Sequence, residues 1–220
     1  MLPLELSGKS GQELSVLCLG AHSDDIEIGC GGTILRLAGA YPNARFHWMV
    51  FTAAGARAEE ARKGAELFTA GCRKEVVLKD FRDGFLPYTG AQVKECFEQL
   101  KSVVSPDVIF THWGSDAHQD HRLLSELTWN TFRNHLILEY EVPKYDGDLG
   151  RPNVFVPLEP AQYEKKVEYL LEVFGSQRSK AWFDRQTFLG LMRLRGMEAS
   201  SASGYAEAFH GRKLVLQGAS

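Results

Sequence analysis

Short apolar runs alternate with helix-spaced segments through residue 135, and this alternation limits the chain to few folds. The apolar runs are short enough to be buried strands, and apolar side chains in the segments between them recur with helical spacing. Strands that alternate with helices of about 10–15 residues form right-handed βαβ units. The sequence therefore predicts an α/β fold with a mostly parallel sheet covered by helices on both faces. The predicted strands are 14–21, 45–53, 74–79 and 106–113, and the predicted helices are 31–40, 57–70, 91–104 and 121–134.

The pattern changes after about residue 136. An extended stretch interrupted by Pro and Gly is followed by a helix at 160–174 and a final extended segment, which predicts a mixed α+β C-terminal part. A length of 220 residues suits one domain, so we expect residues 1–220 to form a single domain, with a core of about 14–135 closed by about 136–220. The irregular segment 139–153, rich in Tyr, Pro and Gly, is hypothesised to cap a pocket or to form a subunit contact.

Composition narrows the choice of partner and compartment. The 25 Lys and Arg residues are balanced by 28 Asp and Glu, with no basic block, so a small-molecule ligand is favoured over nucleic acid. There is no apolar run of about 18 residues, so no membrane span is expected, and the polar N-terminal residues lack the core of a signal peptide. The 4 cysteines have no CxxC spacing, which is typical of reduced thiols in a cytoplasmic protein. Any metal site must then use histidine and carboxylate ligands.

Two polar clusters follow predicted strands. Residues 22–25, His-Ser-Asp-Asp, come directly after the first strand, and residues 118–121, His-Gln-Asp-His, follow the fourth after a short loop, with His112 and Asp116 nearby. In doubly wound sheets the first and fourth strands often lie side by side, and ligands bind beyond the carboxyl ends of the strands. We therefore expect the two clusters to converge on one site.

Convergence would supply the parts for metal-assisted amide or ester hydrolysis. His22, Asp25 and His121 could provide the three N/O ligands that catalytic zinc sites commonly have. Asp24 would be the spare carboxylate that acts as general base. His118, as an imidazolium, would stabilise the oxyanion.

The two clusters also resemble a known family. GAHSDDIEIGCGG followed by THWGSDAHQDH is similar to the A-H-P-D-D and H-P-D-H marks of the zinc-dependent LmbE-like, or PIG-L, N-acetylglucosaminyl deacetylases. The resemblance covers most of the chain and implies a Rossmann-like domain. Supporting matches are Arg57 with Glu60, PDVIFTH before the second cluster, Ser176-Gln177 and the closing segment 205–209.

The resemblance implies that His22, Asp25 and His121 hold one zinc ion per chain. Two histidines and a carboxylate also suit Fe²⁺ or another divalent ion. It implies Asp24 as general base and then general acid, and His118 as the group that polarises the amide oxygen. Asp120 is expected to orient a neighbouring histidine. The expected substrate contacts are Arg57 and Asp83, for both of which a surface ion pair is the alternative, and Trp113, next to the second cluster.

Some positions depart from the family pattern. Ser23 and Gln119 stand where the family has proline, and Thr52-Ala53-Ala54-Gly55 lacks a glutamate that is common near the site. The sugar-recognising residues are therefore less well defined than the metal ligands.

The expected reaction is removal of the acetyl group from an N-acetylated amino sugar or glycoside. An amidase acting on a larger sugar conjugate, a serine hydrolase using Ser23, a thiol nucleophile at Cys30 and a non-catalytic sugar-binding module are the alternatives. The glycines at 29–32 do not complete a dinucleotide-binding G-x-G-x-x-G and are expected to allow a tight backbone turn beside the site. Oligomeric state is left open, with a homo-oligomer as one option.

Overall fold

A computed structural model describes residues 6 and 13–215, and within them the chain builds a mixed sheet of 7 strands in the order β3-β2-β1-β4-β5-β7-β6. Strands β3, β2, β1, β4 and β5 run parallel to one another, and β7 runs antiparallel to both β5 and β6. The predicted mostly parallel α/β sheet is confirmed. The strands are β1 (Ser15–His22), β2 (Arg45–Thr52), β3 (Arg73–Leu78), β4 (Val108–His112), β5 (Leu136–Tyr140), β6 (Val154–Pro157) and β7 (Ala206–Gly211).

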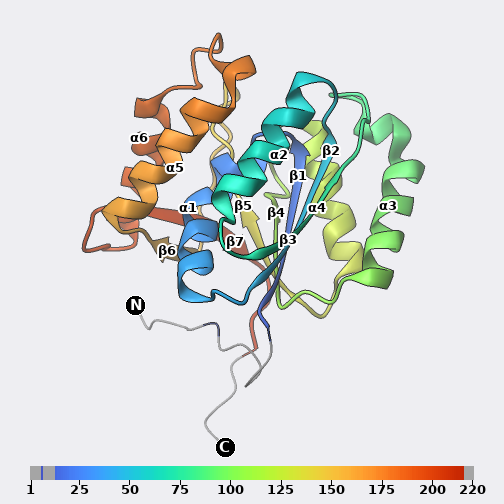
Figure 1. Cartoon of the computed structure of the whole chain (residues 1–220), viewed down its shortest axis with the longest axis horizontal. Helices are drawn as coiled ribbons and strands as arrows, with labels where there is room; N and C mark the ends of the chain where they lie inside the picture. The colour runs from blue at the N-terminus through green and yellow to red at the C-terminus, as the bar shows by residue number, and fades with distance from the viewer. Residues whose placement is uncertain (1–5, 7–12, 216–220) are drawn as a thin grey trace, which may run out of the picture.

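Helices cover both faces of the sheet (Figure 1). One apolar core packs under α1, α2, α5 and α6, and a second core packs under α3 and α4. The predicted helices lie within three residues of observed ones at most ends, except that α1 starts earlier and α6 has no counterpart in the prediction. The helices are α1 (Asp25–Ala40), α2 (Ala56–Phe68), α3 (Gly90–Val103), α4 (Gln119–Thr131), α5 (Pro160–Val173) and α6 (Arg185–Glu198), with short 3-10 turns η1 (Leu86–Thr89) and η2 (Gly175–Gln177).

Helix α1 is broken at Cys30, whose φ of −141° and ψ of 16° are not helical. The predicted helix 31–40 is the half after the break, and the first turn adds residues 25–29. The neighbouring glycines also permit close packing. A Cβ on Gly29 would lie 2.1 Å from the Tyr140 ring, and one on Gly31 would lie 2.5 Å from Phe68. The glycines therefore lie beside a break inside a helix, where a tight turn was expected, and they bring α1 against its neighbours.

Strands β1 and β4 are adjacent, with Val16 opposite Val108 and Cys18 opposite Phe110. Their parallel carboxyl ends therefore place the loops that follow them at one edge of the sheet. This adjacency confirms the expected arrangement of the first and fourth strands. Among the described residues, every helix is too short or too polar to traverse a bilayer.

Candidate metal centre

The two polar clusters meet at this edge of the sheet. His22 is the last residue of β1, Asp25 is the first residue of α1, and His121 lies in the first turn of α4. His22 Nδ1 lies 3.1 Å from Asp25 Oδ2 and 3.1 Å from His121 Nε2, and the third side of this triangle, from His121 Nε2 to Asp25 Oδ2, is 3.4 Å. Ligands about 2.0–2.1 Å from a tetrahedral zinc ion stand about 3.3 Å apart. The three side chains thus fit a divalent metal.

The buried carboxylates also suit a cation. Asp25 is 3% exposed, and its Oδ2 also accepts a hydrogen bond of 2.7 Å from the His22 backbone N–H. Burial alone would raise the pKa of Asp25, but His121, His22 and His112 hold that pKa well below its ordinary value. Burial likewise opposes the charged form of His22, yet Asp25, Asp120 and Asp83 raise its pKa. Negative charge is therefore concentrated where the two imidazoles meet.

His112, the last residue of β4, is a third histidine beside the triangle. Its Nε2 lies 3.3 Å from Asp25 Oδ2, and its ring stacks on His121 with centroids 3.9 Å apart. The Ala21 backbone N–H donates to the same Nε2 at 2.9 Å, which occupies its lone pair. Burial and the neighbouring His121 lower the pKa of His112 to about 4, so the ring is neutral. His112 therefore packs against the ring of His121, and with Asp25 and His121 it forms a further group whose ligand atoms lie within 4.8 Å of one another.

Asp116 contacts the outer nitrogen of His121. Its Oδ2 lies 3.0 Å from His121 Nδ1 and accepts a hydrogen bond of 3.0 Å from Lys144 Nζ. Burial would raise the pKa of Asp116, but His121, His112 and Lys144 hold it well below its ordinary value. Asp116 lies near the second cluster in the sequence, where nothing indicates its role. Lys144 comes from the segment 139–153 and belongs to no local motif that would have identified it.

Asp120 and Asp83 lie on the other side of His22. Asp120 Oδ2 is 3.5 Å from His22 Nε2, and Asp83 Oδ1 is 3.0 Å from the same atom. Asp120 is fully buried and accepts hydrogen bonds from the backbone N–H groups of Gly84 and Leu86 at 2.8 and 3.1 Å. It therefore holds the loop that carries Asp83. The Asp83 side chain is 74% exposed, which places it at the rim of the site.

Asp24 lies beside the triangle with a different partner. Its side chain makes no capping hydrogen bond to α1, and Arg57 Nη2 of α2 donates to its Oδ1 at 2.8 Å. Burial raises the pKa of the Asp24 carboxyl above its ordinary value, even though the guanidinium of Arg57 opposes the shift. Arg57 Nη1 also lies 3.4 Å from Ser176 Oγ. Arg57 is thus a half-buried ion-pair partner of the candidate base.

His118 is the N-cap residue of α4. Its Nδ1 accepts a hydrogen bond of 3.2 Å from the Asp120 backbone N–H, so in the neutral ring the proton lies on Nε2. Its ring centroid is 4.7 Å from those of His22 and His121. Burial and these two neighbours lower the pKa of His118, which favours the neutral imidazole over the expected imidazolium. A neutral Nε2–H can still donate a hydrogen bond to an oxyanion.

The remaining candidates lie outside the cluster or lack partners. Trp113 stacks on His210 with centroids 4.6 Å apart, and the Gly150 backbone packs against its ring edge, so its visible role is packing. Ser23 is fully buried, and its Oγ has no hydrogen-bond partner among the described residues, which argues against a serine nucleophile. Cys30 is buried too, and its thiol donates to the Ile26 carbonyl oxygen.

Comparison with known proteins identifies the chemistry of relatives. The model of the PIG-L family, described as GlcNAc-PI de-N-acetylase, matches residues 17–132, which include both clusters. An uncharacterised deacetylase, YaiS of Escherichia coli K12, is 27% identical over 161 residues, covering 65% of this chain and 82% of that protein.

Solved structures share the fold at low identity. The conserved protein TT1542 of Thermus thermophilus has a TM-score of 0.73 at 20% identity, covering 93% of this chain and 97% of its own. The N,N'-diacetylchitobiose deacetylase of Pyrococcus horikoshii has a TM-score of 0.64 at 20% identity, covering 90% and 83%. The 4-carboxy-2-hydroxymuconate hydratase GalB of Pseudomonas putida has a TM-score of 0.69 at 18% identity, covering 94% and 100%. Since a hydratase shares this fold, the fold alone does not determine the reaction.

Proposed function

The chain belongs to the PIG-L family of de-N-acetylases, and from this premise we propose that it is a metal-dependent hydrolase that removes the acetyl group from an N-acetylated amino sugar or glycoside. The observation that carries the proposal is the triangle of His22 Nδ1, Asp25 Oδ2 and His121 Nε2 with a separate buried carboxylate, Asp24, beside it. Three ligands and a free base are the parts that hydrolysis by activated water requires.

A divalent ion held by these three side chains would polarise the amide carbonyl and make a nearby water more acidic. Asp24 accepts the proton from the attacking water and returns it to the departing amine nitrogen. The Arg57 guanidinium fixes the carboxylate of Asp24 through the bond at Oδ1, which leaves Oδ2 for the water. His118 donates its Nε2–H to the oxygen of the tetrahedral intermediate. Asp116 and Asp120 keep the rings of His121 and His22 in place.

The proposed substrate class is supported by the family description and by the structural similarity to an N,N'-diacetylchitobiose deacetylase. Asp83, exposed at the rim, is proposed to contact a sugar hydroxyl, and zinc is the proposed ion, with Fe²⁺ as the alternative. All four cysteines are free thiols, and three of them are buried, which supports a cytoplasmic location.

The test combines bound metal with acetate release. The protein is stripped with a chelator, resupplied with one divalent metal at a time and offered N-acetylglucosamine and a set of its glycosides. Metal-dependent acetate release is expected. One bound metal without acetate release would reject the simple substrates and indicate a larger conjugate. A protein that binds no stoichiometric metal would overturn the mechanism.

A further inference from the structure

The break in α1 lies over a buried ion pair from the C-terminal part of the chain. In a regular helix the Gly32 N–H would donate to the Ile28 carbonyl oxygen. Here the Gly32 and Thr33 N–H groups donate to the two carboxylate oxygens of Glu207, at 2.8 and 2.6 Å. The Ile28 carbonyl oxygen accepts instead from Lys166 Nζ at 2.6 Å. The backbone N–H and carbonyl groups left without helical partners on the two sides of the break are therefore hydrogen-bonded by side chains from β7 and α5.

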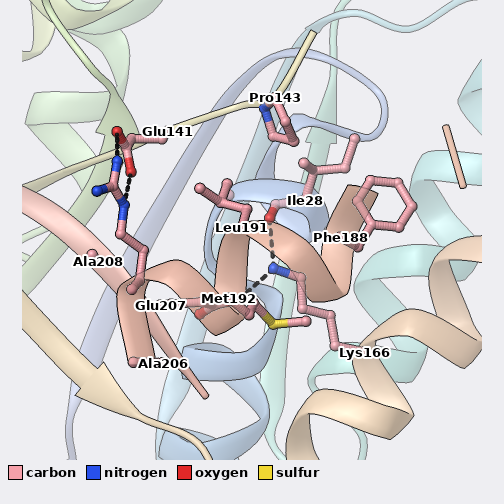
Figure 2. Close-up of a pocket in the computed structure, with 12 residues that line it drawn as sticks. Ile28, Glu141, Pro143, Lys166, Phe188, Leu191, Met192, Ala206, Glu207 and Ala208 are labelled. Carbon is pink, nitrogen blue, oxygen red and sulfur yellow. Dashed lines mark hydrogen bonds and ion pairs between the residues drawn. The ribbon is translucent and has the colours of Figure 1, made fainter. Parts of the chain in front are cut away.

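Lys166 and Glu207 also contact each other. Lys166 Nζ lies 2.6 Å from Glu207 Oε1, and each side chain is 3% exposed (Figure 2). Glu207 faces the N-terminus of the second half of α1, where the helix dipole favours a carboxylate. Neither charge has access to water, so each depends on the other and on the backbone of α1.

A single residue links the ion pair to the backbone at Asp24. Ile28, whose carbonyl oxygen binds Lys166, donates its own backbone N–H to the Asp24 carbonyl oxygen at 3.0 Å. Asp24 is the N-cap residue and Asp25 the first residue of the short turn 25–29, which ends at the break. The turn is therefore anchored at its far end by Lys166, and the next half of the helix is anchored by Glu207.

We propose that Lys166 and Glu207 are positioning residues that hold the turn 25–29, and with it Asp24 and Asp25, in the geometry that the metal centre requires. The inference rests on the proposed function for its catalytic consequence. Its structural part, an anchored turn, stands on the hydrogen bonds alone.

The chain offers a matched control in the ion pair of Arg195 and Glu141. It is also buried, with two hydrogen bonds of 2.7 and 2.9 Å, and both pairs line the same cavity of about 20 Å³ (Figure 2). Arg195 comes from α6, and its hydrogen bonds go to Glu141, Glu198 and Gly150. Because none of these partners belongs to α1, removing Arg195 should cost stability without loosening the turn.

The experiment compares Lys166→Met and Glu207→Gln with Arg195→Met and the wild-type chain. Amide hydrogen exchange of residues 22–33, zinc affinity by competition with a chromophoric chelator, and kcat and KM for acetate release are measured well below each unfolding temperature. We expect exchange in residues 25–33 to rise at least tenfold in the first two variants only. Zinc affinity should fall by about 10–100-fold, as for a lost supporting contact, and kcat should fall with KM unchanged.

The proposal would be overturned if amide exchange rose equally in Arg195→Met, or rose in none of the variants. If the wild type binds zinc, unchanged zinc affinity in Lys166→Met and Glu207→Gln would also overturn it. If Lys166→Met does not fold, Glu207→Gln, which is nearly isosteric, decides. A wild-type chain that binds zinc but releases no acetate would reject the proposed function and leave the exchange and zinc comparisons valid. If the wild type binds no zinc, the exchange comparison alone decides.

Discussion

At the scale of single residues, the two adjacent carboxylates Asp24 and Asp25 have opposite surroundings. Asp25 faces imidazole nitrogens at 3.1 and 3.4 Å, whereas Asp24 faces one guanidinium nitrogen at 2.8 Å. Burial raises the pKa of Asp24 although Arg57 opposes the shift, whereas three histidines outweigh burial and lower the pKa of Asp25. The two pKa values therefore move in opposite directions. Titratable neighbours whose environments separate their pKa values are typical of divided catalytic roles. This contrast supports the proposed roles, with Asp25 as a metal ligand and Asp24 as the base.

This division predicts different losses in two isosteric variants. Asp24→Asn should abolish turnover, because the amide cannot accept a proton, while zinc affinity stays within a few-fold of wild type. Asp25→Asn should lose zinc affinity and turnover together. Measurement of acetate release alongside chelator competition separates the two. Residual wild-type turnover in Asp24→Asn would contradict the base assignment.

A second residue-scale prediction concerns His118. Since its Nδ1 is used by the Asp120 backbone N–H, its one available donor is Nε2–H. His118→Ala should lower kcat by about 10²–10³ through loss of that donor, with little effect on zinc affinity. Steady-state kinetics with the metal-loaded protein checks this. A fall in zinc affinity equal to that in His121→Ala would show that His118 is a ligand instead.

A third prediction concerns the support of His121. Asp116→Asn should weaken zinc binding by about 10–100-fold, because Asp116 contacts the outer nitrogen of that ring. Asp148→Asn is the control, since Asp148 binds the same Lys144 at 2.6 Å but touches no candidate ligand. Competition titration of both variants distinguishes support of the ring from simple loss of the lysine contact. Equal weakening in both would contradict a specific role for Asp116.

The site could be predicted from sequence where its members are close in the chain. The motifs at 22–25 and 118–121 each place several polar side chains on one turn after a strand. Their predicted convergence on one site therefore depended only on β1 and β4 lying side by side. Lys144 and the pairing of Arg57 with Asp24 could not be predicted in this way. Both depend on how loops from distant segments fold over the sheet, and neither lies in a pattern that spacing reveals.

At the scale of elements, helix α6 shows why a periodic pattern can fail. Its buried positions include Phe188, Met192 and Arg195, but Leu194 and Met197 on the other face are 53% and 66% exposed. Apolar residues on both faces obscure the stripe, and a buried arginine does not look like a core residue unless its partner Glu141 is known. The first turn of α1 was not predicted either. The backbone groups on the two sides of the break are satisfied by Lys166 and Glu207, which come from distant parts of the sequence.

The close packing of α1 gives an element-scale prediction. Gly29→Ala should destabilise the chain by about 1–3 kcal/mol, because the new Cβ would lie 2.1 Å from a ring that is held by the hydrogen bond from Tyr140 OH to the Leu19 carbonyl oxygen. Gly39→Ala in the last turn of the same helix meets nothing within 4 Å and should stabilise by up to about 0.5–1 kcal/mol. Urea unfolding compares the two. Destabilisation of similar size in both would contradict the packing argument.

At the scale of the whole molecule, the C-terminal part completes the structure begun by the N-terminal part. Strand β7 pairs with β5, so the sheet is continuous across the change of pattern near residue 136. Helices α5 and α6 share one apolar core with α1 and α2, and Glu207 binds the backbone of α1. A fragment ending near residue 135 would leave that core and two buried backbone N–H groups uncovered. These contacts favour the expected single domain over two independent units.

The last prediction follows from this continuity and from the metal centre together. Urea unfolding followed by tryptophan fluorescence and by far-UV circular dichroism should give one coincident transition, because the core and the sheet contain both parts of the chain. Since the three proposed ligands come from β1, α1 and α4, a zinc ion held by them would bind the folded state selectively. At 100 times its Kd, zinc should add about 2.7 kcal/mol of stability and raise the unfolding temperature by about 5–10 °C. His121→Ala should remove the shift. Two separate transitions would contradict a single domain, and an equal shift in His121→Ala would place the ion elsewhere.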